Sequence, residues 1–147
     1  MKIEQVSDKD IAEIKELARR AILESVKAED SVKTDVIADT ETHIEVNLKK
    51  GGCSFLKCVD DKILGFILIQ EYWNLSDLYV LPDVHRKGIG KILVAGALSD
   101  CFKNGNRDYI RVNSSLNAEG FYRRLGFKSV TPEKEVPSFV VPLIFRF

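Results

Sequence analysis

The chain has 147 residues with 45% hydrophobic and 30% charged residues and a formal net charge of zero, which favours one globular domain spanning residues 1–147. No apolar run reaches the roughly 18 residues that span a membrane, and the opening segment MKIEQVSDKD lacks the apolar stretch of a signal peptide, so we expect a cytoplasmic protein. The basic residues form no long stripe, which disfavours nucleic acid as a partner.

The first half of the chain carries strand and helix signals in a clear order. Ser7 is a plausible N-cap for an amphipathic helix, and Gly51-Gly52 is a stop signal for a second one. The predicted elements are a strand at 2–6, a helix after Ser7, a helix at 30–50, and strands at 53–59 and 63–73 separated by the turn 60–62. The apolar face of the first helix consists of Ile11, Ile14, Leu17, Ala18, Ala21 and Ile22.

The second half alternates strands and helices. We expect a strand at 75–81, a helix that begins at a glycine loop and ends at Asn104-Gly105, a strand at 108–112, a helix at 118–125 capped by Gly126, and a strand at 138–147. The whole order is β-α-α-β-β-β-α-β-α-β. A mixed central sheet flanked by helices, in the α/β class, is the most economical fold for it.

The cysteines and the charges give weaker signals. Cys53, Cys58 and Cys101 are odd in number and fit no zinc or redox spacing, so we expect reduced core thiols and no metal site. Residues 1–80 hold 11 Lys/Arg against 16 Asp/Glu, whereas residues 81–147 hold 11 against 6. This asymmetry suggests that the second half meets an anion.

The stretch VLPDVHRKGIGKIL, residues 80–93, joins a predicted strand to a helix N-terminus. Unpaired backbone N–H groups and the helix dipole attract anions at such a junction. Gly88 and Gly90 allow the main chain to approach a phosphate, because they have no Cβ. Arg86, Lys87 and Lys91 can neutralise its charge, and Ile89 is expected to point into the core.

Two common nucleotide motifs do not fit this loop. A P-loop would need Gly at His85 and Ser or Thr at Ile92. A dinucleotide fingerprint would need Gly at Leu93 and should follow the first strand of the fold. Both readings are therefore excluded.

The loop resembles the pyrophosphate loop of the GNAT superfamily of acyl-CoA-dependent N-acyltransferases, which has the pattern [QR]-x-x-G-x-[GA] after a strand ending in V-x-P. Here Val80-Leu81-Pro82 precedes His85-Arg86-Lys87-Gly88-Ile89-Gly90, and His85 departs from the usual Gln or Arg. A second match, SLNAEGFYRRLGF at 115–127, is similar to the A-x-x-F-Y-x-x-x-G-F helix of that family.

The resemblance implies a splayed mixed sheet with acetyl-CoA between the strands at 75–81 and 108–113. Backbone groups of Leu78, Tyr79 and Val80 would meet the pantetheine arm. Main-chain amides from Arg86 through Lys91, which includes Lys87, Gly88, Ile89 and Gly90, would hold the pyrophosphate. Ser115 stands where many relatives have an asparagine facing the cofactor, and Asn117 is the alternative source of that amide.

The implied reaction moves an acetyl group to a primary amine. A backbone N–H near Val80 could stabilise the charge that develops on the thioester oxygen. Tyr122 resembles the tyrosine general acid of the family and would protonate the leaving thiolate; packing of the Phe121-Tyr122 pair is the structural alternative.

The sequence does not identify the base that deprotonates the amine. Glu71 and Asp77 are the acidic candidates, although an exposed strand carboxylate is at least as good an interpretation of each, and a chain of waters could do the same work. Asn74 supplies no base. His43 and His85 are best interpreted as surface histidines.

Two other classes also stay open: a catalytically silent acyl-CoA-binding sensor, and an interaction domain with the same fold. Four carboxylates near the junction of the two early helices, Glu24, Glu29, Asp30 and Asp35, favour a cationic amine as acceptor. The sequence leaves both a monomer and a homodimer open.

Overall fold

The computed structural model describes residues 1–147 and contains one mixed sheet of seven strands in the order β1-β2-β3-β4-β5-β7-β6. Only the β4–β5 pairing is parallel. The strands are β1 (Lys2–Gln5), β2 (Ser54–Asp60), β3 (Lys62–Gln70), β4 (Asn74–Val80), β5 (Tyr109–Ser115), β6 (Lys128–Ser129) and β7 (Val140–Arg146). The α-helices are α1 (Ile11–Ser25), α2 (Asp30–Lys50), α3 (Ile89–Asn104) and α4 (Glu119–Arg124), with 3₁₀ turns η1 (Asp8–Asp10) and η2 (Pro82–Val84).

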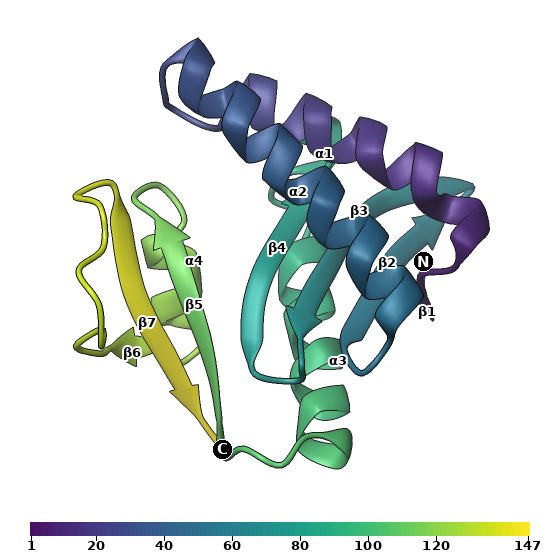
Figure 1. The fold of residues 1–147 in the computed structure, drawn as a ribbon. Helices are drawn as coiled ribbons and strands as arrows, with labels where there is room; N and C mark the ends of the chain where they lie inside the picture. The colour runs from purple at the N-terminus through teal and green to yellow at the C-terminus, as the bar shows by residue number, and fades with distance from the viewer.

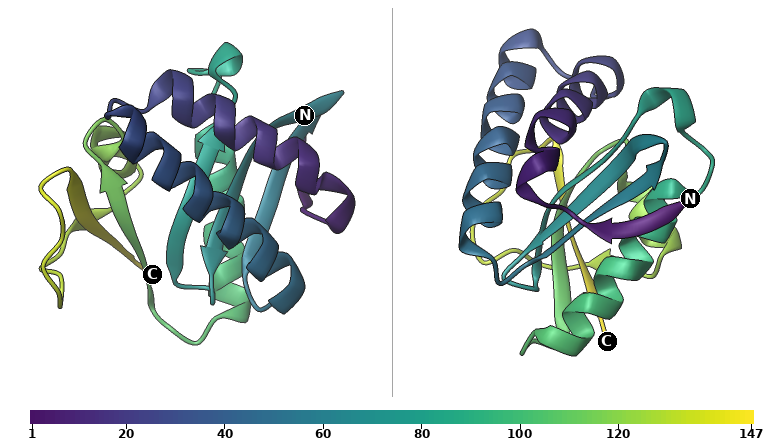
Figure 2. Two further views of the ribbon diagram at one scale, coloured as in Figure 1. Left: turned by 45° about the horizontal axis from the view of Figure 1, so that its top comes forward. Right: turned by 90° about the vertical axis from the view of Figure 1, so that its right-hand side faces the viewer.

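Helices cover both faces of the sheet, with α1 and α2 on one side and α3 on the other (Figures 1 and 2). The central strand β3 therefore has no solvated face. This explains why Phe66, Ile67, Leu68 and Ile69 are an unbroken apolar run with no exposed surface, where a half-exposed strand would alternate.

The predicted mixed α/β sheet and the predicted order of its main elements agree with the structure. The second helix has the predicted bounds, 30–50, and Gly51 and Gly52 both have positive φ after its end. The prediction missed β6, a strand of two residues that pairs with β7 at Ile144 and Leu143. A run this short has no periodicity in the sequence, so only its partner strand reveals it.

Strands β4 and β5 separate soon after they meet. Their ladder consists of two residue pairs, Asn74 with Arg111 and Leu75 with Val112. Immediately beyond it, the register of β3 against β4 shifts so that Ser76 is an extra residue on β4. Such a bulge bends its strand. The two strands consequently diverge toward the end of β4, as Figure 1 shows.

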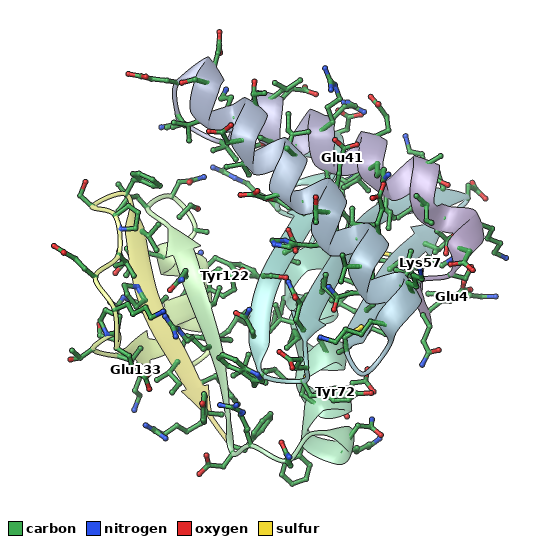
Figure 3. All side chains as sticks on the ribbon, in the orientation of Figure 1. Glu4, Glu41, Lys57, Tyr72, Tyr122 and Glu133 are labelled. Atoms are coloured by element: carbon green, nitrogen blue, oxygen red, sulfur yellow. The ribbon has the colours of Figure 1, made fainter.

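The N-terminal segment is attached to the sheet by a buried ion pair. The Nζ of Lys57 on β2 lies 2.7 Å from Oδ2 of Asp10 and 3.8 Å from Oε2 of Glu4 (Figure 3). Asp10 also accepts hydrogen bonds from the backbone N–H and the hydroxyl of Ser7, the predicted cap. Burial raises the pKa of Asp10, but the bonds from Lys57 and Ser7 outweigh it, and the net pKa lies below the ordinary value.

Replacing Lys57 with Met keeps most of the side-chain volume but leaves the Asp10 carboxylate buried without its cation. We expect the free energy of unfolding, measured in urea, to fall by about 3–5 kcal/mol. Adding Asp10→Asn should restore part of this loss, because an amide needs no counter-charge. The control Lys62→Met changes an exposed lysine and should cost less than about 0.5 kcal/mol. Equal losses in the two single variants would contradict a structural role for the pair.

Candidate functional site

The glycine loop lies between β4 and α3, as predicted, and its backbone is unusual. Gly88 is the N-cap of α3 with φ of 79°, and Arg86, a non-glycine residue, has φ of 67°. Ile89 is 2% exposed and anchors the loop in the core, as predicted. Positive φ at a residue with a side chain is uncommon and concentrates where backbone shape serves a ligand.

Six consecutive backbone N–H groups in this loop, residues 86–91, have no hydrogen-bond acceptor in the protein. The first three belong to no helix or strand, and the next three form the first turn of α3, where no intrahelical acceptor exists. The first bond of the helix runs from Ile92 N–H to the Gly88 oxygen at 3.1 Å. Arg86, Lys87 and Lys91 are exposed around these donors. The arrangement favours a multiply charged anion.

His85, which departs from the pattern of the related loops, is exposed and fastens the loop to β4. Its Nε2 lies 3.0 Å from the carbonyl oxygen of Val80 and donates to it. A histidine at this position can therefore stabilise the same turn in place of the usual Gln or Arg.

The second motif packs directly on the loop. A Cβ built on Gly90 would lie 3.2 Å from Cζ of Phe121, so the aromatic ring of α4 rests against the loop backbone. A Cβ at position 90 would require this ring to move by a few tenths of an ångström. Two motifs about 30 residues apart in sequence thus form one site.

The open edge of β4 supplies further donors next to the loop. Leu81 N–H bonds the Leu64 oxygen on β3 at 2.9 Å. Because successive residues of a strand direct their N–H groups to opposite edges, those of Val80 and Leu78 face the side from which β5 has diverged, while that of Tyr79 faces β3. The structure therefore brings Leu78 and Val80 to the edge where the sequence predicted cofactor contacts.

Ser115 and Asn117 lie at the end of β5 and in the turn that leads to α4, and both are exposed. The hydroxyl of neighbouring Ser114 is buried and donates to the Ser115 carbonyl oxygen at 2.7 Å. No hydrogen bond within the protein engages either predicted side chain, so both amide and hydroxyl are free to meet a ligand.

Tyr122 on α4 projects between β5 and β4 (Figure 3). Its ring is 6% exposed and packs edge-on against Phe121 and Phe127, with centroids 5.2 and 5.3 Å away. Burial raises its pKa strongly, and the nearby Tyr79 and Asp77 add to this. The phenol is therefore protonated at neutral pH and lies close to the face of β4 that carries Asp77.

Asp77 and His43 form a pair that the sequence interpretation missed. The Nδ1 of His43, on α2, lies 2.9 Å from Oδ2 of Asp77, whose side chain is 1% exposed. The same oxygen accepts a 2.7 Å bond from the Ser76 hydroxyl, which in turn accepts from Nε2 of Gln70 at 2.8 Å. The exposed-carboxylate interpretation of Asp77 is therefore wrong. His43 keeps 36% of its side chain exposed, as a surface histidine would, but it also bonds a buried carboxylate, which the surface interpretation did not include.

A pattern in α2 could have indicated this pair. Thr40, His43 and Asn47 recur at three- and four-residue spacing beside the apolar positions Ile37 and Ile44, and Thr40 and Asn47 are buried. Polar residues on the inner face of a helix need partners, so they point to a polar group on the sheet beneath. Thr40 indeed faces the Tyr79 hydroxyl, with 3.5 Å between the oxygens.

Glu71, the other predicted acidic candidate, lies apart from this cluster. It is in the turn between β3 and β4, its side chain is 60% exposed, and its nearest cation is Lys50 at 3.9 Å. That turn is at the end of β4 opposite the glycine loop (Figure 1).

Comparison with known proteins agrees with the geometry. Residues 17–140 match the model of the acetyltransferase (GNAT) domain. The peptidyl-lysine N-acetyltransferase YjaB of Salmonella typhimurium is 35% identical over 82 residues, covering 56% of this chain and 53% of the relative. YjaB of Escherichia coli is 34% identical over 85 residues, covering 56% and 52%. The chain spans about half the length of the curated relatives it matches.

Solved structures show the same fold over nearly the whole chain. The PaiA N-acetyltransferase of Thermoplasma acidophilum, in complex with coenzyme A, has a TM-score of 0.81 at 20% identity, covering 99% of this chain and 98% of that one. YncA of Salmonella typhimurium, a putative acetyltransferase with acetyl-CoA, has a TM-score of 0.74 at 16% identity, covering 99% and 93%. The mixed sheet that opens between β4 and β5 is thus the acyl-CoA N-acyltransferase fold. The chain belongs to the GNAT acetyltransferase family.

The His43–Asp77 pair predicts a pH-dependent contribution to stability. The hydrogen bond to Asp77 raises the pKa of His43 above its ordinary 6.5, against partial burial, with Asp39 adding to the effect. The stabilisation is therefore complete below about pH 6.5 and is lost as the pH rises through the folded-state pKa.

The difference in free energy of unfolding between wild type and His43→Gln should accordingly be constant below about pH 6.5 and shrink as the pH rises above it. Urea unfolding at several pH values measures it. The same comparison in an Asp77→Asn background is the control and should be nearly independent of pH. A difference that grows with pH would contradict the pair.

Proposed function

We propose that this protein transfers the acetyl group of acetyl-CoA to a primary amine. The observation that carries the proposal is the run of six unpaired N–H groups at residues 86–91, adjoining the open edge of β4. With a pyrophosphate at the loop, the pantetheine arm would lie alongside β4, where the backbone groups of Leu78 and Val80 face the open edge and that of Tyr79 faces β3. Ser115 or Asn117 would contact the cofactor from the β5 side. The residues present therefore fit acetyl-CoA as co-substrate.

The chemistry needs a donor at the thioester oxygen and an acid for the leaving sulfur. The Val80 N–H faces the open edge, where it can stabilise the oxyanion. Tyr122 carries the proton for the departing thiolate. Its pKa is raised by burial, but a thiolate leaving in the same dry site is also poorly solvated and is a stronger base than in water. Proton transfer between the two is then feasible.

The acceptor is proposed to be a cationic, lysine-type amine. Glu24, Glu29, Asp30 and Asp35 surround the α1–α2 connection, which lies above the end where β4 and β5 diverge (Figures 1 and 2). Glu24 is paired with Arg20 at 3.1 Å, whereas Glu29, Asp30 and Asp35 have no ion-pair partner, and their charges would draw an ammonium group toward the opening. The two YjaB relatives are named as peptidyl-lysine N-acetyltransferases, which agrees with this choice.

The first test is cofactor affinity by calorimetry. Gly88→Asp places a negative charge in open space at the loop, and we expect acetyl-CoA to bind about tenfold more weakly or worse, about 1.4 kcal/mol. Gly52→Asp is a matched control, because Gly52 also has positive φ and no atom near its Cβ position but lies outside the loop. The Gly52→Asp variant should bind acetyl-CoA as tightly as the wild type. Equal affinities for wild type and Gly88→Asp would overturn the loop assignment.

The second test is turnover, followed by release of free thiol from acetyl-CoA with a panel of amines. Tyr122→Phe keeps the packing of the aromatic ring but removes the phenolic hydroxyl that would donate a proton to the leaving thiolate. We therefore expect kcat to fall by about 10²–10⁴-fold with little change in the affinity for acetyl-CoA. Tyr72→Phe, which deletes a hydroxyl at the far turn (Figure 3), is the control and should be active. Near-normal turnover in Tyr122→Phe would leave the ring a packing role. Binding without turnover in the wild type would favour the sensor alternative.

A further inference from the structure

The pair formed by His43 and Asp77 stands where an amine would approach the acyl group. Asp77 is three residues before Val80 on β4 and directly follows the bulge at Ser76. It is close enough to Tyr122 for its negative charge to raise the pKa of that phenol. His43 covers it from α2. Both residues therefore adjoin the proposed path between the leaving sulfur and the opening under the α1–α2 connection.

The hydrogen bonds determine which nitrogen of His43 can accept a proton. A carboxylate only accepts, so Nδ1 must carry the hydrogen that bonds Asp77. The other nitrogen, Nε2, then holds the free lone pair in the neutral ring. No protein group bonds Nε2, and the side chain is 36% exposed. The imidazole is thus oriented at one nitrogen and open at the other.

Asp77 cannot act on an amine directly. Its side chain is 1% exposed, and its Oδ2 is already bonded by Ser76 and His43. A substrate outside the core reaches this carboxylate only through the imidazole. Asp77 is therefore suited to orient His43 and to stabilise its charged form.

Two charged groups act on His43: Asp77 on β4, and Asp39, which lies one turn back on α2. The Tyr79 hydroxyl faces Thr40, and Lys15 of α1 is paired with Glu45 on the outer side of α2, so none of these engages the imidazole. The two carboxylates favour the imidazolium and raise the pKa of His43, by the bond to Asp77 first. A more basic imidazole is a better proton acceptor in the molecules in which it is neutral.

Resting on the proposed acetyl transfer, we infer that Nε2 of His43 accepts the proton lost by the attacking amine, and that Asp77 is its positioning residue. The ammonium group of the acceptor first releases one proton to water. As the neutral amine nitrogen then bonds the acyl carbon, the nitrogen becomes positive and acidic, and it passes a second proton to Nε2. The C–S bond then breaks, and the sulfur takes the phenolic proton of Tyr122. His43 afterwards releases its proton to water and Tyr122 regains one from water, so the net products are the amide, the free thiol and the one proton that the ammonium group lost.

The test compares His43→Gln, Asp77→Asn and the control Glu45→Gln, which lies two residues along α2 on its exposed side. With a lysine-type amine as probe, His43→Gln should lower kcat by about 10²–10⁴-fold, with acetyl-CoA affinity unchanged. It should also remove the acidic limb that titrates with His43 from the kcat/KM profile against pH, whereas the dependence that comes from protonation of the amine itself, with a pKa of about 10.4, should stay in every variant. Asp77→Asn should move that limb to lower pH, because the carboxylate that raises the pKa is gone. Glu45→Gln should behave as wild type.

A second measurement is independent of turnover. The chain has two histidines, so the ring resonances of His43 are identified by their absence in His43→Gln. Titration by NMR should give His43 a pKa above 6.5 in wild type and a lower one in Asp77→Asn. An unchanged pKa would overturn the positioning role, and thermal melts report whether each variant is folded.

The outcomes separate the two proposals. A wild type that binds acetyl-CoA but acetylates no amine would overturn the proposed function together with this inference. A wild type that is active while His43→Gln keeps both its rate and its acidic limb would overturn the inference alone, and deprotonation by water would then account for the chemistry.

Discussion

The structure depends on the bulge at Ser76, which takes β4 away from β5 after two residue pairs. A continuous ladder would have paired the edge of β4 and closed the sheet. The divergence instead leaves the N–H groups of Leu78 and Val80 without a strand partner. Unpaired backbone groups are costly once they are removed from water, so this edge favours a molecule that can replace the missing strand. The glycine loop continues the same edge with six more donors.

The bulge also accounts for the carboxylate inside the fold. An extra residue on a strand re-aims the side chains that follow it. Leu75 and Asp77, on either side of the bulged Ser76, are both buried. A carboxylate in this position is tolerated because Ser76 and His43 both donate to it. The inner face of α2 must consequently be polar at Thr40, His43 and Asn47, which a helix packed on an apolar sheet would not need.

Features of this protein could be predicted from the sequence where the interacting residues are close together in the chain, and could not where they are far apart. The loop at 86–91 and the helix at 119–124 were predictable because their chemistry is local: glycines, a strand end and a helix start are adjacent in the chain. The contact of Gly90 with Phe121 could be expected only from the family resemblance. His43 and Asp77 are 34 positions apart in the sequence. Their pairing depends on the bulge at Ser76, which no residue pattern predicts. A polar residue in a helical stripe was the one available signal, and it was weaker than the apolar positions around it.

The two-pair ladder between β4 and β5 has a mechanical consequence. The sheet consists of two plates, β1–β4 and β5–β7, joined by a short seam, and bending at a seam requires few bonds to change. The co-substrate of the proposed function, bound where β4 and β5 diverge, would contact both parts of the sheet and hold them in one relative orientation. Its binding free energy adds directly to the stability of that arrangement. On the proposed function, the bound co-substrate would thus supply part of the rigidity of this fold.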